Sequence, residues 1–376
     1  MSPQMAEFLK AKPRIDFSIA LLTSNVVSGP PKNRFLVAFL AILNVFFTFC
    51  VYLHLKNSSW REINFNFLSS LLFFIILCGY AVRANVGRFK KTEMDHLVHN
   101  IKELFDEQEE DEELGQILKK YLMNSMKIFH FCNRWGIRMF LIAGAFASFY
   151  FRLNEEFGLT YDLPIISSEN FVWKDTLHVL QGVMYCVSAF AMISLDLGII
   201  FLGLQVIAEL NILSDYMKLL NEKIKTDQKF LRKIIKRHCS VVKNLNLLSK
   251  IISETTSLQL LLTGVALLFG FTFLIKYTTG IGNYIIIICG GSLSLPICVL
   301  GEFIKLKTEN LSETFYQTNW YELSLKDQKT FLIILGMAQR EYGLKAAGMY
   351  DVNLYTFIQI FKIAFSYCAV LYSLSQ

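Results

Sequence analysis

Two charged residues stand inside long apolar stretches of this 376-residue chain, where an ionised group is costly. Asp196 lies about eight residues from one end of its stretch, and Lys362 lies about ten residues into another, which places them ~12 and ~15 Å deep at the rise of an α-helix. These matching depths allow an ion pair between two helices. The alternative is that Lys362 faces an aqueous vestibule or a subunit boundary beside a conduction path. The sequence leaves both interpretations open.

Motifs of enzyme chemistry do not occur. The chain contains no GxGxxG, Walker A, HExxH or GxSxG pattern. His96 and His99 have helical spacing, but no cysteine or third histidine accompanies them, and their charged surroundings indicate a solvated helix face. We therefore expect no catalytic residue, no metal site and no cofactor.

The two charges lie in two of seven apolar stretches, each of which is about 18 to 28 residues long. A helix needs about 20 residues to cross the ~30 Å of bilayer hydrocarbon. Soluble cores rarely produce seven such runs, so the chain is predicted to be all-α and polytopic, with one seven-helix membrane domain over 1–376. The expected spans are 35–55, 63–82, 131–151, 177–204, 257–275, 284–301 and 352–374.

The basic residues orient these spans. With the N-terminus in the cytoplasm, 29 of the 37 Lys and Arg residues fall in cytoplasmic segments. The positive-inside rule therefore predicts a cytoplasmic N-terminus and, after an odd number of spans, an extracellular C-terminus. This is the reverse of a G-protein-coupled receptor.

Composition agrees with a membrane protein. Hydrophobic residues make up 53% of the chain, and the formal net charge is +6. The basic side chains can face the anionic lipid of the inner leaflet, so the charge needs no nucleic-acid partner. Seven of the eight cysteines lie in or beside spans and one in a cytoplasmic loop, so no extracellular disulfide is expected.

Three cytoplasmic segments are expected to carry structure of their own. The pattern over 215–253 predicts amphipathic helices that extend the fourth and fifth spans, and 311–340 predicts another amphipathic helix. The acidic run 106–113 is interpreted as a solvated patch.

The last third of the chain resembles the signature region of insect odorant receptors. In that family a cytoplasmic Tyr…Trp-Tyr helix precedes a final span with Phe-x-Val-Asn-Leu, a lysine and Ser-Tyr. The matching region covers about 80 residues, and the inverted seven-span layout extends the likeness to the whole chain. The residues that carry it are Cys298, Gly301, Tyr316, Trp320, Tyr321, Asp351 to Phe357, Lys362, Ala364, Ser366 and Tyr367.

Departures from the family pattern also occur. Glu302 stands where Gln or Asn is usual, and Tyr350 stands where Phe is common. The related gustatory receptors end in Thr-Tyr, five apolar residues and Gln-Phe. Here no Gln-Phe follows Ser366-Tyr367, which favours an odour-specific receptor subunit.

The resemblance implies a function. Family members are ligand-gated, non-selective cation channels that assemble as heterotetramers with a shared co-receptor in the plasma membrane of olfactory neuron dendrites. The implied ligand is a small volatile organic molecule. The alternatives are a gustatory-type channel that acts without the co-receptor and, less favoured by the orientation, a G-protein-coupled receptor. The resemblance assigns the anchor between subunits to Tyr316, Trp320 and Tyr321.

The final span is implied to line the pore. By position after Ser366-Tyr367, the apolar gate falls on Val370 and Leu374, with Ser373 in place of a polar pore residue. Val370 and Leu374 are four residues apart on one helix face, and an apolar ring can close a pore by dewetting. From the residues alone, packing or contact with lipid is the favoured interpretation.

The ligand pocket of the family lies in the outer half of the bundle, among spans two, three, four and six. Such a site would be apolar and aromatic, with one or two hydroxyl groups. The residues at that depth are Phe73, Phe74, Ala147, Tyr150, Met184, Tyr185, Ser188, Tyr284 and Ile287.

Overall fold

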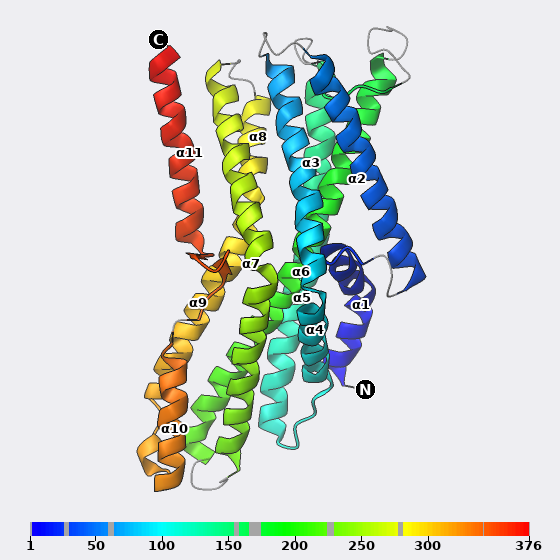
Figure 1. Ribbon diagram of the computed structural model, residues 1–376. Coiled ribbons are helices and arrows are strands. Elements are labelled where there is room, and N and C mark those ends of the chain that lie inside the picture. The colour runs from blue at the N-terminus through cyan, green and yellow to red at the C-terminus, as the bar shows by residue number, and fades with distance from the viewer. Residues whose placement is uncertain are drawn as a thin grey trace.

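The computed structural model describes residues 2–25, 30–58, 64–153, 158–164, 174–223, 229–276, 281–340 and 342–375. Helices dominate these residues, and one two-stranded antiparallel hairpin accompanies them (Figure 1). The elements are α1 (Pro3–Leu22), α2 (Pro31–Asn57), α3 (Phe65–Phe89), α4 (Lys91–Asp106), α5 (Glu112–Leu153), α6 (Lys174–Lys223), α7 (Phe230–Lys276), α8 (Ile281–Ser292), α9 (Leu295–Tyr316), the 3₁₀ turn η2 (Trp320–Glu322), α10 (Leu325–Ala338), β1 (Lys345–Ala346), β2 (Tyr350–Asp351) and α11 (Leu354–Ser375).

The expected all-α membrane fold is confirmed. Six helical segments among the described residues are long and apolar enough to cross a membrane, and Leu354–Val370 of α11 is a shorter apolar helix. The spans correspond in order to α2, α3, α5, α6, α7, the α8–α9 pair and α11. Residue 63, where the second span was expected to begin, lies outside the described residues.

Three helices run far beyond the bilayer. Helices α5, α6 and α7 have 42, 50 and 47 residues, or ~63 to 75 Å at helical rise, against ~30 Å of hydrocarbon. Their lower parts form the cytoplasmic half of the molecule, as the pattern over 215–253 predicted (Figure 1). Residues 224–228, between α6 and α7, lie outside the described part.

The sixth span is a broken helix. It ends as α8 at Ser292 and resumes as α9 at Leu295, with Leu293 and Ser294 in a turn. Pro296 stands in the first turn of α9, where its missing N–H costs no helical hydrogen bond, whereas within one continuous helix it would remove one. The break separates a short outer helix from one that continues into the cytoplasm.

The N-terminal tail forms a helix that the sequence pattern did not reveal. Ser2 caps α1 by accepting a hydrogen bond from the N–H of Met5. Phe8, Ala11 and Ile15 bury one face of the helix against the bundle, where α1 packs on α6 and α5. Its last turn meets α3 at Gly87, where a Cβ would lie 1.8 Å from the carbonyl oxygen of Leu22.

The segment 311–340 is a helical hairpin, so the prediction of one helix there was wrong. Helix α9 ends at Tyr316, the chain turns through η2, and α10 begins after Ser324, which accepts a hydrogen bond from the N–H of Asp327. Capping by Ser324 lets α10 start anew and fold back along α9. The hairpin forms the far cytoplasmic end of the molecule, opposite the C-terminus (Figure 1).

The last helix stands at the edge of the bundle, against α7 and the top of α9. The chain reaches it through the β1–β2 hairpin, in which the N–H of Val352 donates to the carbonyl of Leu344 at 2.8 Å. This junction lies directly on α9, because a Cβ at Gly301 would be 1.8 Å from the carbonyl oxygen of Val352. Glycine at 301 is thus what allows the junction to approach the helix.

Gly301→Ala should therefore separate α9 from the α11 junction. Overpacking of this kind costs roughly 1–3 kcal/mol, so we expect a lower thermal unfolding midpoint of the detergent-solubilised protein and less protein at the cell surface. Gly336→Ala is the matched control. Gly336 is a helical glycine with nothing within 4 Å of its Cβ position, so alanine there should stabilise α10 by roughly 1 kcal/mol. Equal midpoints for the two variants would contradict the proposed close approach at Gly301.

Candidate functional site

A buried polar triad joins the helices in the middle of the bundle. The Arg83 guanidinium of α3 lies 2.6 Å from Asp196 Oδ1 of α6 and donates to Gln259 Oε1 of α7 at 2.9 Å. Gln259 in turn donates to Asp196 Oδ2 at 3.2 Å and to the carbonyl oxygen of Leu293 in the α8–α9 break. One charge pair and one amide therefore tie three helices to the point where the sixth span is broken.

The suggested pairing of Asp196 with Lys362 is wrong. Arg83 occupies the carboxylate, and Lys362 is exposed on α11. The expected second span, 63–82, stops one residue before Arg83, because the apolar run ends at Val82. In the structure α3 continues to Phe89 and Arg83 is fully buried. Hydropathy locates the end of an apolar run, whereas the partner of a buried charge depends on the packing of helices.

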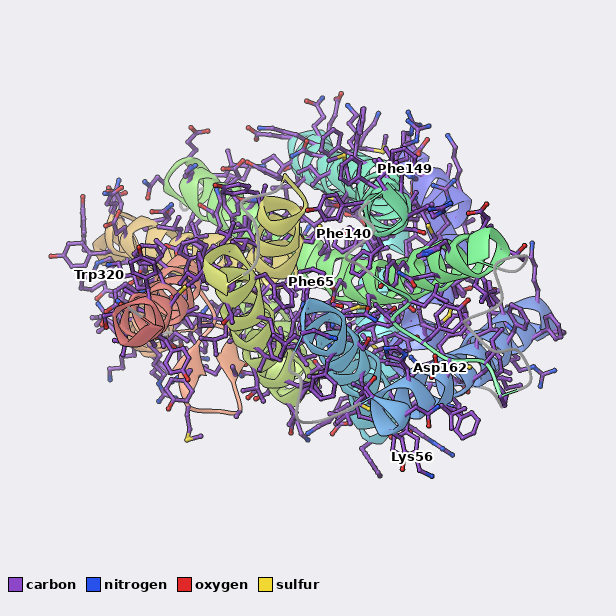
Figure 2. The ribbon with its side chains drawn as sticks, turned by 90° about the horizontal axis from the view of Figure 1, so that it is seen from above. Lys56, Phe65, Phe140, Phe149, Asp162 and Trp320 are labelled. Carbon is purple, nitrogen blue, oxygen red and sulfur yellow. The ribbon has the colours of Figure 1, made fainter. Side chains whose placement is uncertain are left out.

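Aromatic side chains gather in the outer half of the bundle. Tyr185 of α6 meets Phe73 of α3 edge-on, with ring centroids 4.8 Å apart, and Phe151 of α5 at 6.2 Å. Phe65 continues the group, 5.9 Å from Phe151 and 4.7 Å from Phe273 of α7. In the view from the outer end, Phe65 lies among the helices, whereas Phe149 lies on the perimeter (Figure 2). Four helices thus converge on this aromatic group.

Several predicted pocket residues keep accessible surface within the bundle. Phe73, Phe74 and Tyr185 are all partly accessible rather than fully buried, as are Ala147 and Tyr150 of α5. Met184, in contrast, is fully buried, in a cluster with Leu159, Tyr161, Phe47 and Leu177 on which Phe73 and Phe74 also pack.

A segment of the outer loop supplies polar atoms to this region. The Thr160 hydroxyl lies 3.0 Å from the Tyr185 hydroxyl, and the Thr160 N–H donates to Gln181 Oε1 at 3.2 Å. The Tyr161 hydroxyl donates to the carbonyl of Leu177 at 2.8 Å. Residues 158–164 show no periodic pattern, so the sequence analysis missed the polar groups that this loop segment contributes.

The same loop segment is tied to the outer ends of α2 and α3. Asp162 accepts from Asn57 at 3.2 Å and lies 3.1 Å from His54 Nδ1. The Asp162 N–H donates to the carbonyl of Cys50 at 3.1 Å. Hydrogen bonding to His54 holds the pKa of the Asp162 carboxyl below its usual value. The acid is therefore ionised at neutral pH and keeps its partners.

The remaining pocket candidates lie elsewhere. Ser188 lines a small cavity between α2, α3 and α6, together with Asn44 and Tyr80. Tyr284 is half exposed on α8, and Ile287 packs against Gly270 of α7. The structure thus brings Phe73 and Tyr185 into contact and does not join Tyr284 or Ile287 to them.

The implied gate helix packs on one side only. Phe271 of α7 contacts Phe361 and Phe365 with centroids 5.4 and 5.7 Å apart, and Ala364 and Cys368 are buried beside them. Away from α7, the exposed residues of α11 include Lys362, Val370 and Ser373. The side chain of Leu374 lies outside the described part of the structure.

The implied anchor residues lie at the cytoplasmic tip. Trp320 stacks on Phe331 of α10 with an interplanar angle of 9°, which closes the hairpin. Tyr316 and Tyr321 are 71% and 63% exposed. Their neighbours on α10 add further exposed apolar side chains, namely Leu325, Leu332 and Ile333.

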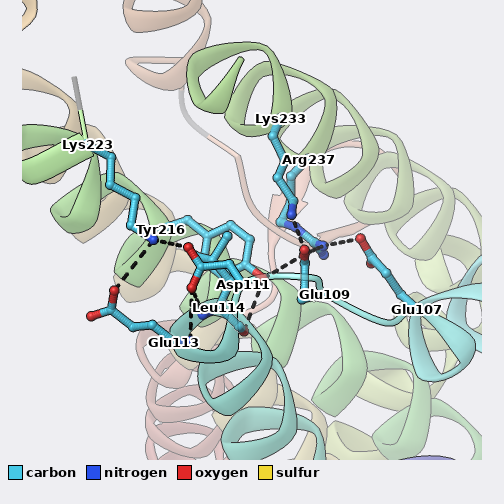
Figure 3. Close-up of polar contacts among 9 residues, drawn as sticks. All are labelled: Glu107, Glu109, Asp111, Glu113, Leu114, Tyr216, Lys223, Lys233 and Arg237. Atoms are coloured by element: carbon cyan, nitrogen blue, oxygen red, sulfur yellow. Dashed lines mark hydrogen bonds and ion pairs between the residues drawn. The ribbon is translucent and has the colours of Figure 1, made fainter. Parts of the chain in front are cut away.

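The acidic run 106–113 is a strap that binds the cytoplasmic ends of α6 and α7 (Figure 3). Most of its residues are exposed, as expected for a solvated patch, but the prediction missed the ion pairs that the run makes. The nearly buried Glu109 carboxylate contacts Lys233 and, at 3.5 Å, Arg237, and it accepts from the Tyr216 hydroxyl at 2.9 Å. Composition shows the charge of the run, but only the fold shows the basic side chains that face it. The other pairs are Glu107 with Arg237 at 2.7 Å, Asp111 with Lys223, and Glu113 with Lys223 at 3.6 Å.

Among the described residues, no group of His, Cys, Asp and Glu side chains is placed to hold a metal ion. The arrangement consists instead of an aromatic site in the outer half, a polar triad below it, a helix with one uncovered side and a cytoplasmic tip. These are features of binding and assembly.

Comparison with known proteins gives one consistent family. The model of the 7tm Odorant receptor family matches residues 64–365. Odorant receptor 49a of Drosophila melanogaster is 23% identical over 298 residues, which cover 73% of each chain. Odorant receptor 42b of the same species is 29% identical over 139 residues, and there the match spans only 33% of the relative's length.

A solved structure shares the fold over the whole chain. The insect olfactory receptor OR5 from Machilis hrabei, in complex with eugenol, superposes with a TM-score of 0.76 and covers 99% of this chain and 100% of its own. The sequence identity is 13%, so this likeness concerns the fold alone.

Breaking the buried triad should destabilise the protein strongly. Arg83→Met leaves the Asp196 carboxylate buried without its cation, a change that costs about 3–5 kcal/mol in buried pairs. We expect a marked fall in the thermal unfolding midpoint and in surface expression. The double variant Arg83→Met/Asp196→Leu removes both charges and should recover part of the loss. Lys362→Met, outside the triad, is the control and should leave the midpoint of the isolated subunit unchanged. A double variant that is less stable than Arg83→Met would refute the coupling of the two residues.

Proposed function

The chain belongs to the 7tm Odorant receptor family, a family of ligand-sensing receptors rather than enzymes, and from this premise we propose its molecular role. It is the odorant-binding subunit of a ligand-gated, non-selective cation channel. It assembles with shared co-receptor subunits as a heterotetramer in the plasma membrane of olfactory neuron dendrites.

The one-sided packing of α11 is the observation that carries this proposal. An isolated helix at the edge of a bundle, with Lys362 exposed away from α7, cannot enclose a channel by itself. Copies of such a helix around a central axis can, because each then turns its uncovered side toward the others. A lysine there also gains access to water, which lowers the cost of a charge at membrane depth.

The cytoplasmic tip supports assembly as well. Tyr316 and Tyr321 are exposed beside the apolar residues of α10. Together they form an apolar surface whose exposure to water is unfavourable. Aromatic residues of this kind are enriched at protein interfaces. We assign Tyr316, Trp320 and Tyr321 to the anchor between subunits, with Trp320 shaping the hairpin from within.

The outer aromatic group supports the ligand assignment. Phe73, Tyr185 and Phe151 bring three aromatic rings and one hydroxyl group together in the outer half, a composition that suits a small volatile molecule. The related receptor OR5 was solved with eugenol, a small aromatic compound. We place the odorant of this chain among α3, α5 and α6.

Co-expression separates the proposed channel from its alternatives. Cells that express this chain with an insect co-receptor should show odour-evoked, non-selective cation current within a fraction of a second, without GTP in the recording pipette. Cells with the co-receptor alone provide the baseline. Equal ligand-gated current from this chain expressed alone would favour a gustatory-type channel, and a requirement for GTP would favour a G-protein-coupled receptor.

Polar substitution of the gate should make the closed pore leak. If Val370 and Leu374 contribute to an apolar ring, Val370→Ser and Leu374→Ser should favour water in the closed pore. We expect higher basal current or altered ion selectivity at preserved surface expression, diluted by the apolar gate residues of the other subunits. Ala364→Ser, on the side that packs against α7, is the matched control within the same helix. Unchanged basal current, selectivity and ligand response in both gate variants would remove these residues from the pore.

A further inference from the structure

We propose that Thr160, Gln181 and Tyr185 form the polar recognition point of the ligand site, and that it selects small apolar molecules carrying one oxygen acceptor, such as ketones, aldehydes and esters. This inference rests on the proposed odorant-binding function and specifies the ligand class. Its distinctive element is Thr160, which comes from the outer loop rather than from a membrane-spanning helix.

The directions of the hydrogen bonds follow from one fixed donor. The Thr160 backbone N–H can only donate, and it does so to the side-chain oxygen of Gln181 at 3.2 Å. The amide nitrogen of Gln181 therefore faces Tyr185 and donates to its hydroxyl oxygen at 3.3 Å. The oxygen and nitrogen of a glutamine amide are usually hard to tell apart. Here the backbone N–H of Thr160 determines which end is the oxygen.

A count of protons then shows what is left for a ligand. Tyr185 and Thr160 are 3.0 Å apart and share one hydrogen bond, in which either hydroxyl donates. Two hydroxyl groups carry two protons, and this bond uses one of them. The described structure therefore leaves one O–H donor of this pair without an acceptor. A ligand oxygen with a lone pair is the complement that such a donor requires.

The position of the donor is held from both sides along the chain. The carbonyl of Leu159 accepts from Asn66 at 2.9 Å, and the N–H of Asp162 donates to Cys50 on α2 at 3.1 Å. These contacts and the Asp162–His54 pair keep the loop backbone on the outer ends of α2 and α3. Thr160 thus lies between two residues whose backbone groups are bonded to α3 and α2.

The surroundings make the donor selective. The Phe73 and Phe151 rings flank Tyr185, and both Thr160 and Gln181 are fully buried. A hydroxyl donor without an acceptor has a higher free-energy cost in apolar surroundings than in water, where a water molecule accepts its hydrogen bond. A hydrocarbon that fills the site leaves the O–H unpaired, whereas a ketone of the same shape satisfies it. Sites built around a hydrogen bond discriminate in this way more strongly than apolar pockets discriminate by size.

The test compares isosteric probe pairs that differ in the oxygen alone: acetophenone with α-methylstyrene, and 2-heptanone with 2-methyl-1-heptene. Two responses are measured for each probe. One is the half-maximal concentration for current in cells that co-express the co-receptor, and the other is the ligand-induced shift of the unfolding midpoint of the full-length purified chain. In the wild type, one ketone at least should act at about tenfold lower concentration than its hydrocarbon isostere, the ratio expected for one neutral hydrogen bond.

The decisive variant is Thr160→Val/Tyr185→Phe, which removes both hydroxyl groups and keeps the backbone donor to Gln181. It should bring the ratio of the half-maximal concentrations for hydrocarbon and ketone close to one, while the hydrocarbon response is retained. Thr160→Ser preserves the hydroxyl and should preserve the ratio. Tyr161→Phe is the matched control, since Tyr161 lies in the same loop but donates its hydroxyl proton to the carbonyl of Leu177 on α6, outside the recognition point. It should also keep the wild-type ratio.

The outcomes that would overturn the inference are separate from those that would overturn the proposed function. Equal midpoint shifts by both members of each probe pair on the wild type would refute the oxygen preference, whether or not the double variant folds. An equal loss of response to ketones and hydrocarbons in the double variant would show a structural role only. A ketone-selective midpoint shift without any odour-evoked current would support the recognition point and refute the channel.

Discussion

A charge buried within the hydrocarbon layer needs an opposite charge inside the protein, and the rest of this structure depends on how Arg83 and Asp196 meet that need. Arg83, Asp196 and Gln259 bond to one another at the junction of α3, α6 and α7, while the Nε of Arg83 has no partner among the described residues. Gln259 also reaches the backbone where the sixth span is broken. The free carbonyl that the break creates at Leu293 thereby gains a donor. The triad lies between the outer aromatic group and the cytoplasmic half, where it connects α3 and α6 to α7 and to the α8–α9 break.

The two halves of the molecule are stabilised by different physics. In the outer half, ring contacts and a few hydrogen bonds from residues 158–163 close the bundle. In the cytoplasmic half, the extensions of α5, α6 and α7 stand in water, and the acidic strap binds α6 and α7 through Lys223, Lys233 and Arg237. Exposed ion pairs contribute little, but the pair of Glu109 is nearly buried and shares its carboxylate with Tyr216. The strap thus gives the cytoplasmic helices a defined spacing beneath the membrane.

Two apolar surfaces of the described chain remain uncovered, and these are the surfaces that we propose for assembly. Helix α11 is covered by α7 on one side only, and the α9–α10 hairpin exposes Tyr316, Tyr321 and Leu325 to water. The first surface lies at membrane depth and the second at the cytoplasmic tip. Since α11 and α9 meet at Gly301 and Val352, the two surfaces belong to one continuous edge of the subunit. Subunits that associate along this edge would join the anchor to the pore helix directly.

The sequence by itself determined the membrane class, the number and order of the spans, the orientation of the chain and the family, because apolar length, basic residues and motif order are properties of the linear chain. It also predicted that Phe73 and Tyr185 lie at one depth, which helical rise decides. Only the tertiary structure decided that Arg83 is the partner of Asp196, that the acidic run is a strap, and that Thr160 reaches Tyr185. Each of these contacts joins residues about 25 to 130 positions apart. The angle and rotation at which helices pack determine such partners. The periodicity of residues within one helix does not reveal them.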